Sequence, residues 1–259
     1  MQLLESRDHW QDVGYEVLTG EFRVGEQVCI TRPAENSPVS IDSAQAGKII
    51  SSYVAPNAND EVDWIARGVR EFLSGGLQPE DIMIVALDDR NARAYFRLIS
   101  EELAKHGIST NNIIADAYSE PPFSLPGMVT LSTVYRAKGN ESAVVFALGI
   151  DAISSRTRSG RNRLFTAFTR TKAWLRVSGV GDGARDFCRE IEAALAHFPN
   201  IEFVMPDLRK VDLIQRDLSE KAIKAKRIRD EYVRRLRKEG FTEEEIPELL
   251  SFEAKNAKQ

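Results

Sequence analysis

The sequence has few of the residues that build metal sites and disulfide frameworks. It contains only 2 cysteines and 3 histidines in 259 residues. Cys29 and Cys188 are too far apart to form a metal motif, and His9, His106 and His197 include no pair at the spacing of metal ligands. We therefore expect no protein-held metal and no disulfide framework, as is usual in a reducing cytoplasm.

Long hydrophobic runs are also missing. No apolar run approaches the roughly 20 residues that a membrane-spanning helix needs, and the opening residues, MQLLESRD, lack the pattern of a secretory signal. The net charge of −4 argues against a nucleic-acid surface that covers the whole molecule. Hydrophobic residues make up 42% of the chain, which is enough to bury a sizeable core. We expect a cytoplasmic protein without a membrane partner.

Apolar runs alternate with helical periods through the middle of the chain. Strands are predicted at residues 49–54, 82–87, 112–116, 128–133, 143–149, 174–180 and 201–204, and helices at about 59–74, 91–105, 161–172 and 184–198. This alternation is typical of an α/β fold with a mostly parallel sheet and helices on both faces. Ligands of such sheets usually bind at the carboxyl ends of the strands.

Three regions are predicted along the chain. Residues 1–47 read as a junction or linker-like arm with a short strand at 27–31, and residues 48–207 as the α/β domain. Residues 208–259 read as a charged helical tail that contains a strongly basic segment at 209–238. Such a segment is typical of a solvated helix, and a nucleic-acid contact is the alternative.

Two of the predicted strands are joined by a short segment that carries charge and a glycine. The segment TVYRAKGNESAVVF begins at Thr133, which offers a hydroxyl group, and Gly139 permits close approach of a backbone. Arg136 and Lys138 add positive charge, and Glu141 adds an acceptor. This set suits phosphates and ribose, and no Ser, His and Asp set for acyl transfer accompanies it. An ordinary charged surface loop is the alternative.

A second element carries arginines on a predicted helix. In RNRLFTAFTRTKAWLRVSG, Arg163 and Arg170 are seven residues apart, so on a helix they would share one stripe. Ala167 lies between them and leaves room beside them. A guanidinium on a core-packed helix is pre-oriented, as an arginine finger must be. The alternative is that Arg170 pairs with a carboxylate of a neighbouring element.

Together these elements resemble motifs V and VI of superfamily 1 DNA helicases of the UvrD/Rep/PcrA type. VTLSTVYRAKGNESAVVFALG is similar to motif V, TxHxxKGxExxxVF, and RNRLFTAFTRTKAWLRVSG is similar to motif VI, RRLxYVAxTRAxxxLxL. PEDIMIVALDDRNARAYFRLISEELAKHGI resembles a strand–helix unit of the same domain. The resemblance covers about residues 48–205. It implies a C-terminal RecA-like domain, with the P-loop NTPase fold, of an ATP-dependent helicase or translocase.

The resemblance implies a nucleotide-facing group of residues. Arg170 aligns with the motif VI arginine that reaches the γ-phosphate of ATP, which is the catalytic role. Glu141, Gly139 and Lys138 align with motif V residues near the nucleotide. Arg163 aligns with the basic residue that precedes the motif VI leucine, and it is expected on the nucleotide as well.

The resemblance also implies contacts with single-stranded DNA. The candidates are Thr133, Tyr135, Arg136, Asn91 and Arg93. Tyr135 stands where the family usually has histidine. A phenol can still stack on a base or donate a hydrogen bond, but it does not titrate near pH 7.

The larger departure from the family is an absence. The sequence contains no G-x-x-x-x-G-K-S/T loop, and no apolar run ends in paired acidic residues that are followed by a QD-like catalytic segment, so the phosphate-binding loop and the carboxylate that hold Mg²⁺ are both missing. ATP and Mg²⁺ are therefore expected to be held mainly by an N-terminal RecA-like domain that is fused or on a separate chain. We expect half of an ATP hydrolase, inactive alone. The alternative is a helicase-like binding module in a nucleic-acid repair or defence complex, whereas a nuclease is disfavoured because no D…E-x-K cluster follows a strand.

Overall fold

The computed structural model describes residues 6–36, 43–115, 121–154 and 157–207, together with Val233 and Leu236. The chain divides into two compact units, Met1–Leu213 and Ile214–Gln259. The predicted helical tail and its basic segment at 209–238 lie outside the described residues, apart from the two residues just named.

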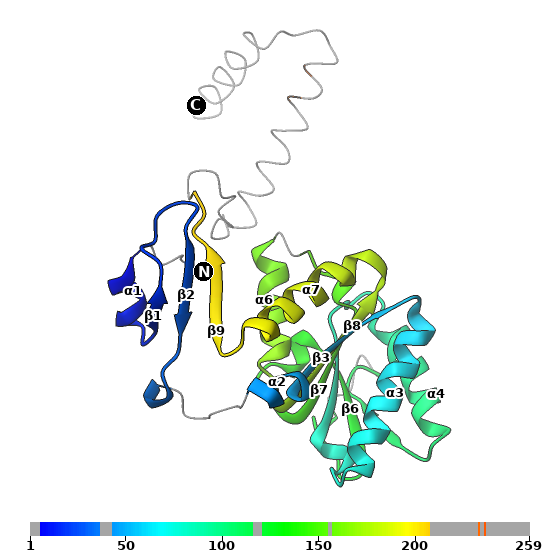
Figure 1. Ribbon diagram of the computed structural model, residues 1–259. Coiled ribbons are helices and arrows are strands. Elements are labelled where there is room, and N and C mark those ends of the chain that lie inside the picture. Colours follow the sequence, from blue (N-terminus) through cyan, green and yellow to red (C-terminus); the bar gives the residue numbers. More distant parts are fainter. Residues whose placement is uncertain are drawn as a thin grey trace, which may run out of the picture. The chain divides into compact units, whose positions relative to one another are not determined.

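The first unit contains a six-stranded parallel sheet (Figure 1). Its strands are β3 (Ile50–Ala55), β4 (Ile82–Ala86), β5 (Ser109–Asn112), β6 (Met128–Thr133), β7 (Ser142–Leu148) and β8 (Thr171–Val180), in the spatial order β3-β8-β7-β4-β6-β5. Every pairing in the sheet is parallel. The predicted α/β, RecA-like fold is thus confirmed.

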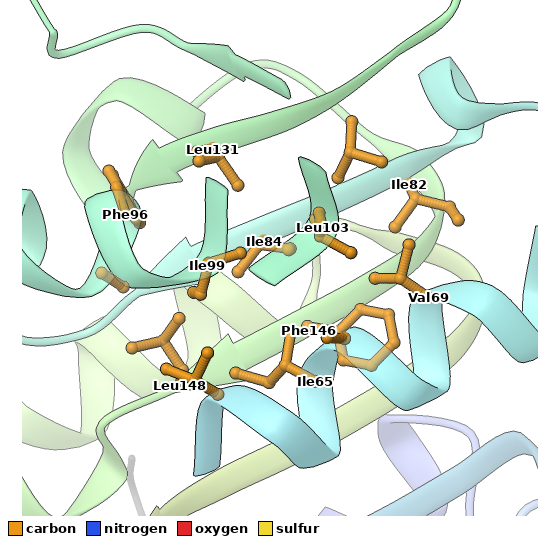
Figure 2. Packing of buried hydrophobic residues seen from close by; sticks show 14 of the residues in the cluster. Ile65, Val69, Ile82, Ile84, Phe96, Ile99, Leu103, Leu131, Phe146 and Leu148 are labelled. Carbon is orange, nitrogen blue, oxygen red and sulfur yellow. The ribbon is translucent and has the colours of Figure 1, made fainter. Parts of the chain in front are cut away.

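Helices cover both faces of the sheet because the strands are apolar on both faces. All five residues of β4 are buried, and they alternate between two cores. Ile82, Ile84 and Ala86 pack with α3 (Ala58–Ser74) and α4 (Ala92–Ala104), and Figure 2 shows this core around Phe146. The other core packs against α5 (Val134–Ala137), α6 (Arg158–Phe168) and α7 (Gly181–His197).

Some predicted boundaries are wrong at the ends of elements. The helix expected from about residue 59 begins at Ala58, because the Asn57 side chain caps it and accepts hydrogen bonds from the N–H groups of Asn59 and Asp60 at 2.9 and 3.0 Å. The strand expected at 112–116 is β5, which begins at Ser109. Its residues are polar because β5 is the edge of the sheet and pairs only with β6.

A second, three-stranded antiparallel sheet contains β1 (Glu16–Thr19), β2 (Gln27–Thr31) and β9 (Asn200–Val204). The short strand expected at 27–31 is β2. The strand expected at 201–204 is β9, and it pairs with β2 and not with the large sheet. This sheet has its own small core of Val17, Val28, Ile30 and Met205.

The remaining elements are short. They are α1 (Arg7–Asp12), α2 (Ser43–Ile49) and the 3₁₀ turns η1 (Ala34–Asn36), η2 (Pro79–Asp81) and η3 (Ile150–Ala152). Within the described ranges, none of the helices has the length and apolar character required to cross a membrane.

Candidate nucleotide and nucleic-acid site

Residues 134–141 connect β6 to β7 and cross the large sheet along the strand direction. They run from the side where the strands have their carboxyl ends, here called the carboxyl edge, to the side where the strands have their amino ends, the amino edge. They leave the carboxyl end of β6 and enter the amino end of β7, and β4 lies between these two strands. Val134 and Ala137 are buried in the core between the sheet and helices α5, α6 and α7, so the segment crosses the sheet packed against this face. Only its first residues therefore lie at the carboxyl edge, where ligands of such sheets usually bind, and its last residues lie at the amino edge.

The crossover turns sharply before it enters β7. Asn140 donates its N–H to the Ala137 carbonyl at 3.0 Å, while Lys138 has φ −60° and ψ 126° and Gly139 has φ 89°. These are the angles of a type II turn, which requires a positive φ at its third residue. Gly139 is thus explained by the turn itself. Lys138, Gly139 and Glu141 are exposed around it.

Arg170 lies at the same amino edge, in the turn between α6 and β8. The predicted helix 161–172 is wrong at its end: α6 stops at Phe168, and the Thr169 hydroxyl donates to the Phe165 carbonyl at 2.8 Å. Arg163 and Arg170 therefore do not share a helical stripe. The backbone N–H of Ser142 donates to the Arg170 carbonyl at 3.0 Å, which places Arg170 beside Glu141, the residue that follows the turn at residues 137–140; we call residues 137–141 the Glu141 turn.

The Arg170 side chain is partly exposed and is held by neutral groups. Its Nε donates to the Thr166 carbonyl at 3.0 Å, and Nη2 donates to the Thr169 hydroxyl at 3.2 Å. Within the part of the chain that the structure describes, no carboxylate pairs with it. The ion pair that was the alternative for Arg170 is therefore not present among these residues.

Arg163 lies at the opposite, carboxyl edge. Its Nη2 donates to the Leu87 carbonyl and to Asp89 Oδ2, the latter at 2.8 Å. Its Cζ lies 5.6 Å from the centroid of the Tyr135 ring. Burial raises the pKa of the Asp89 carboxyl group, and the charge of Arg163 opposes that rise. The structure thus groups Arg163 with Tyr135, a nucleic-acid candidate, and separates it from Arg170.

The other nucleic-acid candidates also lie near the carboxyl edge, because Ala86 at the end of β4 pairs with Thr133 at the end of β6. Thr133 is only 8% exposed, whereas Tyr135 is 66% exposed. Arg93 and Arg136 are exposed. The edge therefore presents an open aromatic ring and cations.

The Asn91 side chain makes a hydrogen bond within the protein at the carboxyl edge. Its side-chain amide donates to Asp88 Oδ2 at 2.6 Å, and Asp88 Oδ1 also accepts from the Arg90 N–H at 3.1 Å. This turn leads into α4, which begins at Ala92 and not at the preceding aspartates. The Asn91 side chain must leave Asp88 before it can contact a ligand.

Sequence reasoning missed Glu61, which is completely buried at the carboxyl edge. Its Oε1 accepts from the Ser178 hydroxyl at 2.7 Å and from the Gly149 N–H at 3.1 Å. Burial raises the pKa of this carboxyl group, although hydrogen bonds from Ser178, Gly149 and Tyr95 oppose the rise. The one signal in the sequence is that Glu61 lies four residues before the buried Ile65, on the inner face of its helix.

The described residues provide cations that suit a nucleotide, but they provide no cluster of metal ligands. Lys138 and Arg170 lie at the amino edge with open surface, and such cations suit phosphate oxygens. Among the side chains that the structure describes, no group of three or more His, Cys, Asp or Glu residues could hold a metal ion.

Residues 128–178 match the family model described as the UvrD-like helicase C-terminal domain. The matched segment contains β6, the crossover, α6 and most of β8. This match confirms the resemblance to motifs V and VI. None of the curated proteins matches the sequence.

Several solved structures are similar to parts of the chain. One is the C-terminal domain of a possible DNA helicase from Lactobacillus plantarum WCFS1, with 20% identity, coverage of 51% of this chain and 74% of that one, and a TM-score of 0.39. Another is arterivirus nonstructural protein 10, a helicase solved with DNA, with 13% identity, coverage of 53% and 30%, and a TM-score of 0.34. A third is the HK97 bacteriophage large terminase, with 14% identity, coverage of 52% of this chain and 29% of that one, and a TM-score of 0.36.

These likenesses are distant, and the chain spans less than a third of the arterivirus and phage proteins. The TM-scores lie below 0.5, so the conclusions on fold stand on the strand order, and those on family stand on residues 128–178.

Proposed function

We propose a function for this chain from the premise that residues 128–178 belong to the UvrD-like helicase C-terminal domain. In this proposal, residues 48–207 are the C-terminal half of an ATP-dependent DNA helicase or translocase. The observation that carries the proposal is Arg170: it lies beside the Glu141 turn, and its guanidinium is held by neutral oxygens in the described part of the chain.

The amino edge is the nucleotide-facing surface of the proposed motor. Arg170 contacts the γ-phosphate of an ATP molecule and stabilises the charge that develops as the phosphoryl group leaves. Such an arginine contributes roughly 10³–10⁵ in rate in other nucleotide hydrolases. Lys138 attracts the phosphates, and Glu141 accepts hydrogen bonds from ribose or from the partner domain. ATP and Mg²⁺ are held mainly by a second RecA-like domain, since this sequence has no phosphate-binding loop.

The carboxyl edge is the surface for single-stranded DNA. Arg93 and Arg136 are exposed there and attract the phosphate backbone, and Tyr135 offers a ring to a base. Contacts of this kind are sensitive to salt and tolerant of sequence.

The crossover at residues 134–141 connects the two surfaces within one short segment. Closure of the partner domain on Arg170 and the Glu141 turn moves the same segment whose first residues face DNA. Because Val134 and Ala137 pack in the core, the segment moves as a packed unit and not as a free loop. This arrangement supports the coupling of ATP hydrolysis to movement along DNA.

The purified chain tests this proposal directly. Without a partner domain it should hydrolyse no ATP, and it should bind single-stranded DNA with an affinity that falls as salt rises. Replacement of Arg93 by Ala should reduce the slope of log K against log salt by up to about 0.7, the value for one phosphate contact on a single strand. Arg185→Ala is the matched control, because Arg185 is exposed on α7 and its ion pair is with Asp182, in the same helix. Robust ATP turnover by the chain alone, or an affinity for single-stranded DNA that does not change with salt concentration, contradicts the proposal.

A further inference from the structure

We propose that Arg163 is a positioning residue that holds the Tyr135 ring as a stacking platform for a base of single-stranded nucleic acid. This inference rests on the proposed function and deepens it. It moves Arg163 from the nucleotide, where the helicase resemblance puts it, to the DNA-facing edge of the sheet.

The guanidinium of Arg163 is fixed by two hydrogen bonds to the segment that follows β4. Leu87 and Asp89, which follow β4, accept its hydrogen bonds, the second at 2.8 Å. Leu87 is fully buried, so one of the two anchors is part of the rigid core. The Arg163 side chain is 24% exposed. A guanidinium held in this way cannot move to keep contact with a phosphate that changes position, but it can hold a neighbouring ring in place.

Tyr135 needs such support because its own helix is very short. It lies in α5, which has four residues, and its neighbours Val134 and Ala137 point into the core while the ring points outward. Arg163 Cζ lies 5.6 Å from the ring centroid, which is within the range of a cation–π contact. The contact limits the ring to one orientation, yet 66% of Tyr135 stays exposed and available to a ligand.

A nucleobase is the ligand that fits this surface best. Every base has a π-face that can stack on an exposed tyrosine, regardless of sequence. The same edge carries exposed Arg90 and Arg93, which suit the phosphates that flank a stacked base. A platform ordered before binding also costs less to use, since the ring is not immobilised at the moment of association.

Two oligonucleotides separate stacking from charge. An oligothymidylate and an abasic oligomer have the same number of phosphates, and only the first has bases. Fluorescence anisotropy with the full chain gives the affinity for each. Loss of stacking on one base corresponds to about a 5-fold to 150-fold loss of affinity.

We expect Tyr135→Ala to weaken binding of the oligothymidylate by an amount in this range and to leave the abasic oligomer unchanged. Arg163→Ala should weaken the same ligand selectively. Tyr135→Phe keeps the ring and should bind as the natural chain does, whereas Arg163→Lys should lose part of the preference. Phe165→Ala is the matched control, since Phe165 is an exposed aromatic residue on the same helix as Arg163. Thermal unfolding checks each variant, and the conservative pair decides the test if either alanine variant does not fold.

Three results overturn the inference, and they are distinguishable. If the natural chain binds both oligomers equally, no base stacks and the proposed function stands without this platform. If Arg163→Ala, or Arg163→Lys in its place, weakens both oligomers alike, Arg163 is a phosphate contact. If the natural chain binds neither oligomer, the DNA surface of the proposed function fails together with the platform.

Discussion

The buried carboxyl group of Glu61 gives a prediction in which stability depends on pH. Its Oε1 accepts hydrogen bonds from Ser178 and from the Gly149 N–H, so Glu61 joins α3 to the ends of β8 and β7. Replacement by alanine leaves both donors without an acceptor and opens a cavity. An unsatisfied buried donor costs about 1–3 kcal/mol, so we expect Glu61→Ala to lower the free energy of unfolding by about 2–5 kcal/mol.

Glu61→Gln separates the hydrogen bonds from the charge. The amide oxygen can accept both bonds, but glutamine cannot ionise. Because burial raises the pKa of Glu61 in the folded chain, its contribution to stability is fully present below the unfolded pKa, which is about 4.3, and is lost as the pH rises through the folded value. The glutamine variant has no such loss. We expect it to match the natural chain near pH 5, within about 1 kcal/mol, and to exceed it at pH 8.

Denaturant unfolding at pH 5 and pH 8, followed by circular dichroism, measures both variants against the natural chain. At pH 8 the hydrogen bonds of Glu61 stabilise the folded chain and its buried charge destabilises it. The order of the three unfolding free energies at pH 8 is therefore decisive. If Glu61→Gln is as unstable at pH 8 as Glu61→Ala, the carboxyl group is needed as an anion, and the reasoning from burial is wrong.

The turn before β7 gives a further prediction about stability. Gly139→Ala forces a side chain into a positive φ and should lower the free energy of unfolding by about 1–2 kcal/mol, even though no atom lies within 4 Å of the added Cβ. Gly47→Ala is its control: Gly47 lies inside α2, also has open space around a Cβ, and lacks a positive φ, so alanine should stabilise by up to about 1 kcal/mol. Thermal unfolding of both variants decides the matter, and equal effects would show that backbone conformation at position 139 is unimportant.

Much of the large sheet could be predicted from the sequence because its elements have strong patterns. The run at 82–87 is apolar throughout and becomes β4, the strand buried on both faces. Elements with weak patterns were misplaced or missed. β5, which was expected three residues too late, is polar and lies at the edge of the sheet, and the missed β1 has one buried residue among four. No local pattern could show that β9 pairs with β2, since the choice of partner depends on contacts about 170 residues apart in the chain.

The candidate site was predictable in its residues and less so in its geometry. The stripe that joined Arg163 to Arg170 assumed that the helix continues to residue 172. No glycine or proline marks its end, and a threonine hydroxyl bonded to a carbonyl of the preceding turn accompanies the stop at Phe168. The turn then places Arg170 at the amino edge, while Arg163 stays at the carboxyl edge with Asp89. The crossover spans both edges.

Arg170→Ala in the assembled motor tests the central claim most directly. The chain is combined with its phosphate-loop domain, and ATP hydrolysis, binding of a non-hydrolysable ATP analogue and binding of single-stranded DNA are measured. The account predicts that hydrolysis falls by about 10³-fold or more, with Arg170→Lys also impaired, while DNA binding stays unchanged and Arg185→Ala behaves as the natural chain. If Arg170→Ala hydrolyses ATP at the natural rate, this arginine does not face the nucleotide and the account is wrong.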